Sequence, residues 1–255
     1  MKALYTAATG MTAQQARLDN IANNLANVNT TGYKRQAAAF QDLLYQDVAQ
    51  GGGQGEGSSV VQIGGGVRIV GNARDHRSGS LKSTEQPLDM ALVGDGFFQL
   101  ESEDGELRYT RDGAFGLDEE GRLISASGMV VSGDIQVDPE AGSVEVQADG
   151  SVRQLTADGS SFTSIGQMTV VRFLNPAGLE ALGGNLYMGT PGSGEPEEIE
   201  VGVDVDIKQG YLESSNVNVA TELIGMIEAQ RAYELTSKMV QASDEAMQTA
   251  VNLKR

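Results

Sequence analysis

Apolar residues recur at both ends of the chain with the alternating three- and four-residue spacing of a coiled-coil seam. The spacing extends over residues 4–28 at the N-terminus and over residues 219–251 at the C-terminus. It predicts one long helix at each end, each with an apolar stripe that must pack against another surface. We therefore predict that the stripes are an assembly interface. Its residues are Leu4, Met11, Leu18, Ile21, Leu25, Val28, Val219, Leu223, Met226, Tyr233, Val240, Met247 and Val251.

The boundaries of the two helices carry separate signals. The first helix is predicted over residues 3–28, because the Asn, Thr and Gly residues of the stretch 27–32 favour caps and turns. The second helix is predicted to begin after Asn218, a good N-cap, and to end near residue 253. Gly10 and Gly225 lie inside the helical patterns, where glycine costs about 1 kcal/mol relative to alanine. They indicate a close approach of backbones between subunits, or glycines that the helices simply tolerate.

The middle of the chain has the period of a β-strand. From about residue 60 to residue 207, β-rich runs such as 67–70, 97–100 and 168–173 alternate with turn signals. Asp-Gly pairs supply the positive φ angles that tight hairpins need. Such pairs begin at residues 95, 104, 112, 149 and 158. Many short strands joined by such turns predict an antiparallel β structure.

These elements predict an α+β fold with more than one domain. Residues 1–45 and 211–255 would form one discontinuous helical domain, in which the long terminal helices pair like a coiled coil. Residues 71–210 would form a mainly antiparallel β domain on the outside. Residues 46–70, which contain the run Gly51-Gly52-Gly53-Gln54-Gly55-Glu56-Gly57, would be a Gly-rich extended linker.

Charge is distributed unevenly along the 255 residues. The net charge of −17 lies entirely in residues 46–210, because residues 1–45 carry +2 and residues 211–255 carry −2. An acidic chain lacks the basic face that binding to nucleic acid requires. We expect no nucleic-acid partner.

Candidate chemistry is scarce. The chain has no cysteine, and its single histidine, His76, lies among polar turn formers, where an exposed loop histidine is the expected state. The glycine-rich runs lack the lysine and the helix start of a phosphate-binding loop. No pair of carboxylates stands out as a glycosidase centre. We predict no catalytic, cofactor-binding or metal-binding residues, and no enzyme activity.

Two short stretches resemble the signatures of the bacterial flagellar rod and hook protein family. Residues 22–35 (Ala-Asn-Asn-Leu-Ala-Asn-Val-Asn-Thr-Thr-Gly-Tyr-Lys-Arg) resemble its N-terminal signature, and residues 214–220 and 230–234 resemble its C-terminal one. Residues 40–46, 96–99 and 109–113 are similar to motifs of its distal-rod members. The signature residues at the helix boundaries are Asn23, Asn24, Asn27, Asn29, Thr30, Gly32, Asn216 and Asn218.

The resemblance implies a structural subunit that polymerises into a straight helical drive shaft, which transmits torque from the rotor to the hook. It implies a place in the basal body, in the rod that crosses the periplasm. The implied partners are copies of the same chain, other rod proteins, the hook protein and the surrounding ring proteins. The asparagines of the N-terminal signature would satisfy the backbone where the first helix ends.

The resemblance also implies passage through the flagellar export apparatus. The start of the chain lacks the apolar region of a secretory signal, and no run of about 18 apolar residues occurs, so we expect neither a cleaved signal nor membrane insertion. Phe40 and Leu44 resemble the element by which early export substrates engage the secretion gate. A packing turn of helix explains their four-residue spacing equally well.

Other functions remain open from the sequence. The chain could be another axial subunit, of the proximal rod or hook type. It could instead be a surface-exposed β-rich adhesion protein that its terminal helices oligomerise. A carbohydrate-active enzyme that uses carboxylates of the acidic middle is a third alternative.

Overall fold

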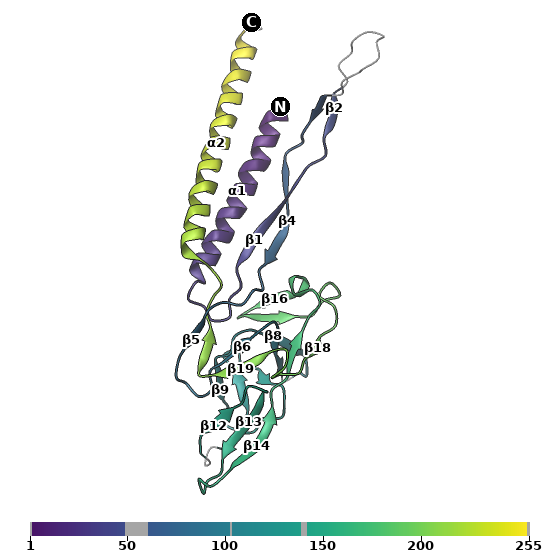
Figure 1. Ribbon diagram of the computed structural model, residues 1–255. Helices are drawn as coiled ribbons and strands as arrows, with labels where there is room; N and C mark the ends of the chain where they lie inside the picture. The colour runs from purple at the N-terminus through teal and green to yellow at the C-terminus, as the bar shows by residue number, and fades with distance from the viewer. Residues whose placement is uncertain (1, 49–60, 103, 139–141, 254–255) are drawn as a thin grey trace. The chain divides into compact units, whose positions relative to one another are not determined.

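The computed structural model describes residues 2–48, 61–102, 104–138 and 142–253 (Figure 1). The chain folds into two compact units, each assembled from separate stretches of sequence. Unit 1 comprises Met1–Ala26, Gln36–Arg74 and Asn218–Arg255, and unit 2 comprises Asn27–Arg35 and Asp75–Val217. The two ends of the chain therefore belong to one unit.

In unit 1 the terminal helices lie side by side. They are α1 (Lys2–Ala26) and α2 (Val219–Asn252), and they run antiparallel, with the C-terminal turns of α2 extending past the start of α1 (Figure 1). Both predicted helices are confirmed. The predicted N-cap is confirmed as well, because the Asn218 side chain accepts a hydrogen bond from the Thr221 backbone N–H over 3.2 Å.

A long antiparallel ribbon lies along α1 in the same unit. In this ribbon β1 (Gln36–Asp42) pairs with β4 (Val67–Arg74). The ribbon continues where β2 (Gln46–Val48) pairs with β3 (Val61–Ile63). The interpretation of residues 40–44 as a turn of helix is wrong, because Phe40 lies in β1, opposite Ile69. The run Gly51–Gly57, part of the predicted Gly-rich extended linker, lies outside the described residues.

Unit 2 is built from antiparallel strands, which confirms the predicted β-rich middle. In the described part of the chain its largest sheet has nine strands, and β12, β13 and β14 form a separate sheet. β6 pairs with β19, and β5 pairs with β20. The elements of unit 2 are β5 (Leu81–Ser83), β6 (Met90–Val93), β7 (Phe97–Glu101), β8 (Leu107–Thr110), β9 (Phe115–Leu117), β10 (Leu123–Ser125), β11 (Val130–Val131), β12 (Val144–Val146), β13 (Ser151–Leu155), β14 (Phe162–Gln167), β15 (Val170–Arg172), the 3-10 helix η1 (Pro176–Gly178), β16 (Glu180–Gly183), β17 (Leu186–Met188), β18 (Glu197–Glu198), β19 (Asp206–Gln209) and β20 (Tyr211–Glu213).

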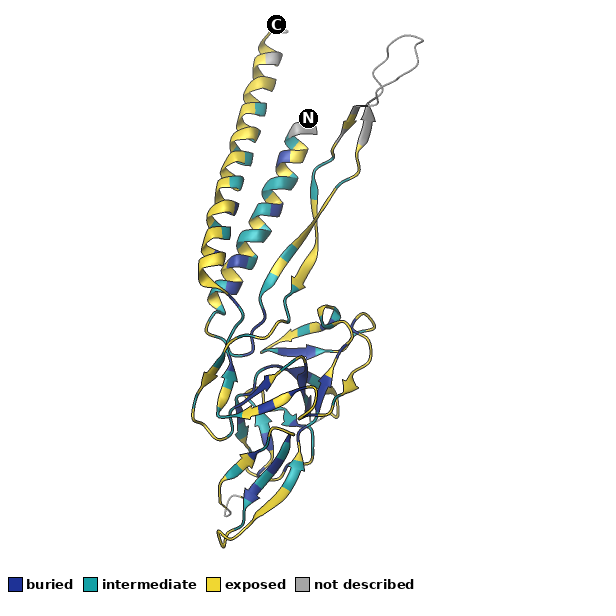
Figure 2. Cartoon of the chain, viewed as in Figure 1, coloured by how far each residue is buried: buried dark blue, intermediate teal, exposed yellow. Residues whose placement is uncertain are grey.

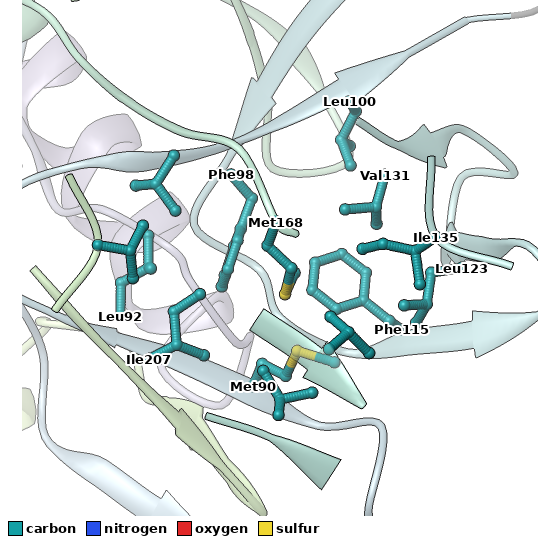
Figure 3. Packing of buried hydrophobic residues seen from close by; sticks show 14 of the residues in the cluster. Met90, Leu92, Phe98, Leu100, Phe115, Leu123, Val131, Ile135, Met168 and Ile207 are labelled. Carbon is teal, nitrogen blue, oxygen red and sulfur yellow. The ribbon is translucent and has the colours of Figure 1, made fainter. Parts of the chain in front are cut away.

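The hydrophobic core of unit 2 covers both faces of β7. Phe98 and Leu100 point into the main cluster, where Phe98 meets the ring of Phe115 edge to face (Figure 3). Phe97 points the other way, into a second cluster with Phe173 and Tyr187. Successive side chains of a strand face opposite sides. Because Phe97 and Phe98 are consecutive and both buried, both faces of β7 are covered.

His76 borders the second cluster. Its ring lies 5.7 Å from that of Phe97 and 5.6 Å from that of Tyr187, both edge to face. The prediction of an exposed loop histidine is wrong, because the side chain is half-buried. The polar neighbours along the chain gave no sign of the aromatic residues that fold against it.

The Asp-Gly pairs serve two purposes. The pairs beginning at residues 104, 149 and 158 form the turns of the hairpins β7–β8, β12–β13 and β13–β14, and each of their glycines has a positive φ. The glycine of the pair beginning at residue 112 instead passes close to β6. A Cβ on Gly113 would lie 1.6 Å from the Met90 carbonyl oxygen, so no larger residue fits there.

Candidate assembly interface

Glycines lie in the contact between α1 and α2 within one chain. Ala7 and Ala13 on α1 are buried, and Ala229 on α2 is completely so. A Cβ added to Gly10 would lie 3.5 Å from Thr236 Cγ2, and one added to Gly225 would lie 3.4 Å from Ile21 Cδ1. The glycines noted in the sequence therefore face the other helix of the same chain. The glycines let the two helices approach closely at these points, where the large side chain of Ile21 is buried.

The large apolar residues of the predicted interface differ in exposure between the two helices. On α1, Ile21 is buried, and Leu4, Met11, Leu18 and Leu25 are half-buried. On α2, Met226 and Val240 are half-buried, whereas most of the helix surface is exposed (Figure 2). The exposed seam residues of α2 are Val219, Leu223, Tyr233, Met247 and Val251. Val28 belongs to unit 2 and is half-buried there.

A second group of apolar side chains is exposed on α2 besides the predicted seam. Its members are Ile224, Ile227, Leu235 and Met239, whose exposed fractions lie between 51% and 62%. Sequence analysis missed them because they fall outside the three/four seam. A long helix with this much exposed aliphatic surface is suited to contact with further copies or partners.

Asn24 links three elements of unit 1. Its side-chain oxygen accepts from the Gln36 backbone N–H (2.9 Å), and its side-chain nitrogen donates to the Gln36 carbonyl oxygen (2.8 Å) at the start of β1. The same nitrogen donates to Glu222 Oε2 on α2 (3.2 Å). Asn24 and Glu222 are both 1% exposed. A signature asparagine thus satisfies strand backbone at the end of the first helix.

The rest of the N-terminal signature forms a tight turn in unit 2. The Thr30 backbone N–H donates to the Asn27 carbonyl oxygen, and the Thr30 hydroxyl donates to the Asn27 side-chain oxygen. Gly32 has φ +66°, and a Cβ there would lie 2.7 Å from the Asp112 backbone nitrogen. This position therefore requires glycine. Asn23, at the end of α1, and Asn29 are exposed.

The C-terminal signature holds the N-terminal one through Asn216. The Asn216 side-chain oxygen accepts from the Arg35 backbone N–H over 2.7 Å. Its side-chain nitrogen donates to the carbonyl oxygens of Asp75 (2.8 Å) and Arg77 (3.0 Å). One amide thus fixes the stretches on either side of the β1–β4 ribbon to the chain that leads into α2.

Sequence analysis missed a buried ion cluster beside these turns. Lys34 Nζ donates to Glu213 Oε1 over 2.7 Å, and Arg111 Nη1 lies 3.4 Å from Glu213 Oε2. Lys34 Nζ also donates to the Arg77 carbonyl oxygen, and Arg111 Nη2 to that of Gly94. Glu213 stands between Leu212 and Ser214, and no local pattern in the sequence marks it as buried.

The proposed export element is exposed. Phe40 lies in β1 with 40% of its surface exposed, and Leu44 follows the strand with 91% exposed. Within the described ranges, no helix is long and apolar enough to cross a membrane.

Hydrogen bonds and ion pairs that join chain segments, together with an exposed apolar helix surface, suit the class of structural proteins. Comparisons with known proteins identify the family. Residues 4–34 match the family described as flagella basal body rod protein, residues 91–154 match the flagellar hook protein FlgE/F/G D1 domain, and residues 208–253 match the flagellar basal body rod FlgEFG protein C-terminal region.

Full-length relatives agree with these matches. The flagellar basal-body rod protein FlgG of Borreliella burgdorferi is 41% identical over 266 residues, which cover 100% of this chain and 99% of that protein. FlgG of Buchnera aphidicola subsp. Acyrthosiphon pisum is 40% identical over 251 residues, or 96% of each chain. FlgF of Caulobacter vibrioides is 35% identical over 254 residues, with 98% and 96% covered. The chain belongs to the flagellar basal-body rod protein family.

Proposed function

We propose that this chain polymerises into the straight helical shaft of the flagellar rod, with its exposed terminal-helix surface as the contact between copies. It is a structural subunit of the distal rod, since its FlgG relatives match it over nearly its whole length. The adhesion-protein alternative does not account for those relatives. The carrying observation is the exposed aliphatic surface of α2, which the small-residue contact with α1 leaves uncovered.

A rotating shaft must resist torque along its whole length. Torque is resisted by a large area of packed contacts, and a reactive site contributes nothing to it. Each large apolar side chain that a neighbouring copy covers contributes about 1.5–3 kcal/mol. Contacts between different faces of identical subunits, when the rotation does not close, generate an open helical polymer. The seam residues would then pack in coiled-coil fashion between copies as well as within one.

In this proposal the two domains have different roles. The helical domain made by residues 1–45 and 211–255 would supply the contacts between copies, and residues 71–210 would form the outer β domain. That outer part carries the acidic charge. Other rod proteins, the hook protein and the surrounding ring proteins would be its partners in the basal body, where the rod crosses the periplasm.

The proposal also covers how the subunit reaches the rod. The subunit would travel unfolded through the flagellar export apparatus without a cleaved signal and fold at the growing tip. Phe40 and Leu44 would engage the secretion gate at that stage. Substitution of both by alanine should reduce export while leaving the purified protein folded, which quantification of secreted and cellular subunit would test.

Imaging of the concentrated purified protein tests the proposal. Straight filaments of one diameter are expected, and their loss when residues 1–30 are removed would identify the terminal helices as the contact. Protein that remains monomeric at high concentration, or filaments that persist without residues 1–30, would contradict it.

A further inference from the structure

Glu213 is the shared counterion of two buried cations in unit 2. Its two carboxylate oxygens face Lys34 and Arg111, and none of the three residues is more than 2% exposed. The Gly79 backbone N–H also donates to Glu213 Oε1 over 2.6 Å. The cluster therefore holds two positive charges and one negative charge away from water.

Burial and neighbouring charges shift the pKa values of both cations. Burial lowers the pKa of Lys34, Glu213 opposes that change, and Arg111 lowers the pKa further. Burial likewise lowers the pKa of Arg111, with Glu213 again opposing it. A buried charge without its partner is strongly unfavourable. Lys34 can lie beside Arg111 at low cost only when the Glu213 carboxylate is present.

Glu213 binds the segment Asn27–Arg35 through its backbone as well. Its carbonyl oxygen accepts from the Gly32 backbone N–H over 2.8 Å. The segment follows α1 directly. Glu213 is the last residue of β20 and lies 179 positions after Lys34 in the chain. One residue near the C-terminus thus supplies both the charge and a backbone acceptor for a segment near the N-terminus.

We infer that Glu213 controls the docking of Asn27–Arg35 on unit 2, so that this segment becomes fixed only after β20 is in place. Before that, docking would bury Lys34 beside Arg111 without the carboxylate that they share, leaving only the weaker influence of Asp75 on Lys34 and of Asp95 on Arg111. This consequence rests on the proposed function: if the export that it assumes threads the N-terminus first, the segment after α1 would stay undocked until nearly the whole chain has emerged. The end of α1 and the approach to α2 would then be fixed in one late step.

Amide hydrogen exchange on the dilute full-length chain tests this inference without requiring a polymer. The reporters are the backbone N–H groups of Gly32 and Arg35, which donate to Glu213 and Asn216. Glu213→Gln keeps the shape of the side chain and removes its charge. We expect it to speed exchange at both reporters by about a hundredfold, while the amides of β7 keep their protection. Glu197→Gln, which removes an exposed partner of Arg172, should change neither.

A second variant separates charge from packing. Lys34→Met in the Glu213→Gln background removes one of the two unpaired cations, so it should restore protection at Gly32 and Arg35 by at least tenfold. If Glu213→Gln unfolds unit 2 altogether, the double variant should regain the fold. Unchanged reporters in Glu213→Gln, or a double variant no better than the single one, would overturn the inference. Failure of filament formation alone would contradict the proposed function and leave this result standing.

Discussion

Asn24 on α1 donates a hydrogen bond to Glu222 on α2 over 3.2 Å, and both side chains are buried. Because Asn24 also pairs with both backbone groups of Gln36, it connects the two helices and the ribbon of unit 1. Asn24→Leu would leave buried polar groups without these bonds. We expect unit 1 to lose about 1–3 kcal/mol of unfolding free energy, measured by denaturant titration of the helical circular-dichroism signal.

A matched control for this substitution lies on the same helix. Gln15 is exposed, and its side chain donates a hydrogen bond to Asp19, four residues along the helix. Gln15→Leu should change the unfolding free energy by less than about 0.5 kcal/mol. Equal effects of the two variants would show that the Asn24 contacts contribute nothing specific.

Gly225 tolerates a methyl group but nothing larger. Its added Cβ would lie 3.4 Å from Ile21 Cδ1 and 3.9 Å from Arg17 Nη2, which is ordinary contact. Gly225→Ala should therefore raise the stability of unit 1 by about 0.5–1 kcal/mol, because alanine favours the helix. Gly225→Leu should lower it, since the longer side chain separates the helices. Thermal unfolding of both variants would check that the two stability changes have opposite signs. Destabilisation by alanine would contradict the contact geometry.

Gly32 is confined by both its conformation and its neighbours. It has φ +66°, and a Cβ would lie 2.7 Å from the Asp112 nitrogen. We expect Gly32→Ala to destabilise unit 2 by more than the roughly 1–2 kcal/mol that the left-handed conformation alone costs. Gly105→Ala gives that conformational cost by itself, because Gly105 has φ +78° and open space around it. Denaturant titrations should rank Gly32→Ala as the more harmful, and the reverse order would be inconsistent with this packing.

Asp75 gives unit 2 a small dependence on acid pH. Its hydrogen bonds with the Arg77 side chain and backbone hold the pKa of the Asp75 carboxyl below its ordinary value of 3.8. A lowered folded-state pKa contributes stability that is present above the ordinary pKa and is lost as the pH falls through the folded one. Asp75→Asn should therefore flatten the stability profile below about pH 4. A profile identical to that of the unmodified protein would contradict this assignment.

The sequence predicted the elements of this fold better than their contacts. Heptad spacing located α1 and α2, and Asp-Gly pairs located three hairpin turns, because both signals act over a few residues. Gly10 and Gly225 signalled a close approach of backbones, but no local pattern showed that the neighbour is the other helix of the same chain. Glu213 and Lys34 are 179 positions apart. No local pattern reveals which distant charge a buried residue meets.

The central claim is that the exposed apolar surface of α2 joins copies of the chain. Leu223 and Ile227 lie one helical turn apart on this surface, with exposed fractions of 44% and 51%. Glutamate at both positions should leave the folded monomer intact, because neither side chain is buried in it. Leu223→Met with Ile227→Leu keeps the surface apolar and serves as the control.

Electron microscopy of the concentrated protein, with the unfolding midpoint of each variant measured in parallel, tests that claim most directly. We expect straight filaments of one diameter from the unmodified chain and from the Met/Leu control. The double glutamate variant should unfold at the same midpoint and form none. Filaments of normal length and diameter from the double glutamate variant would contradict the account.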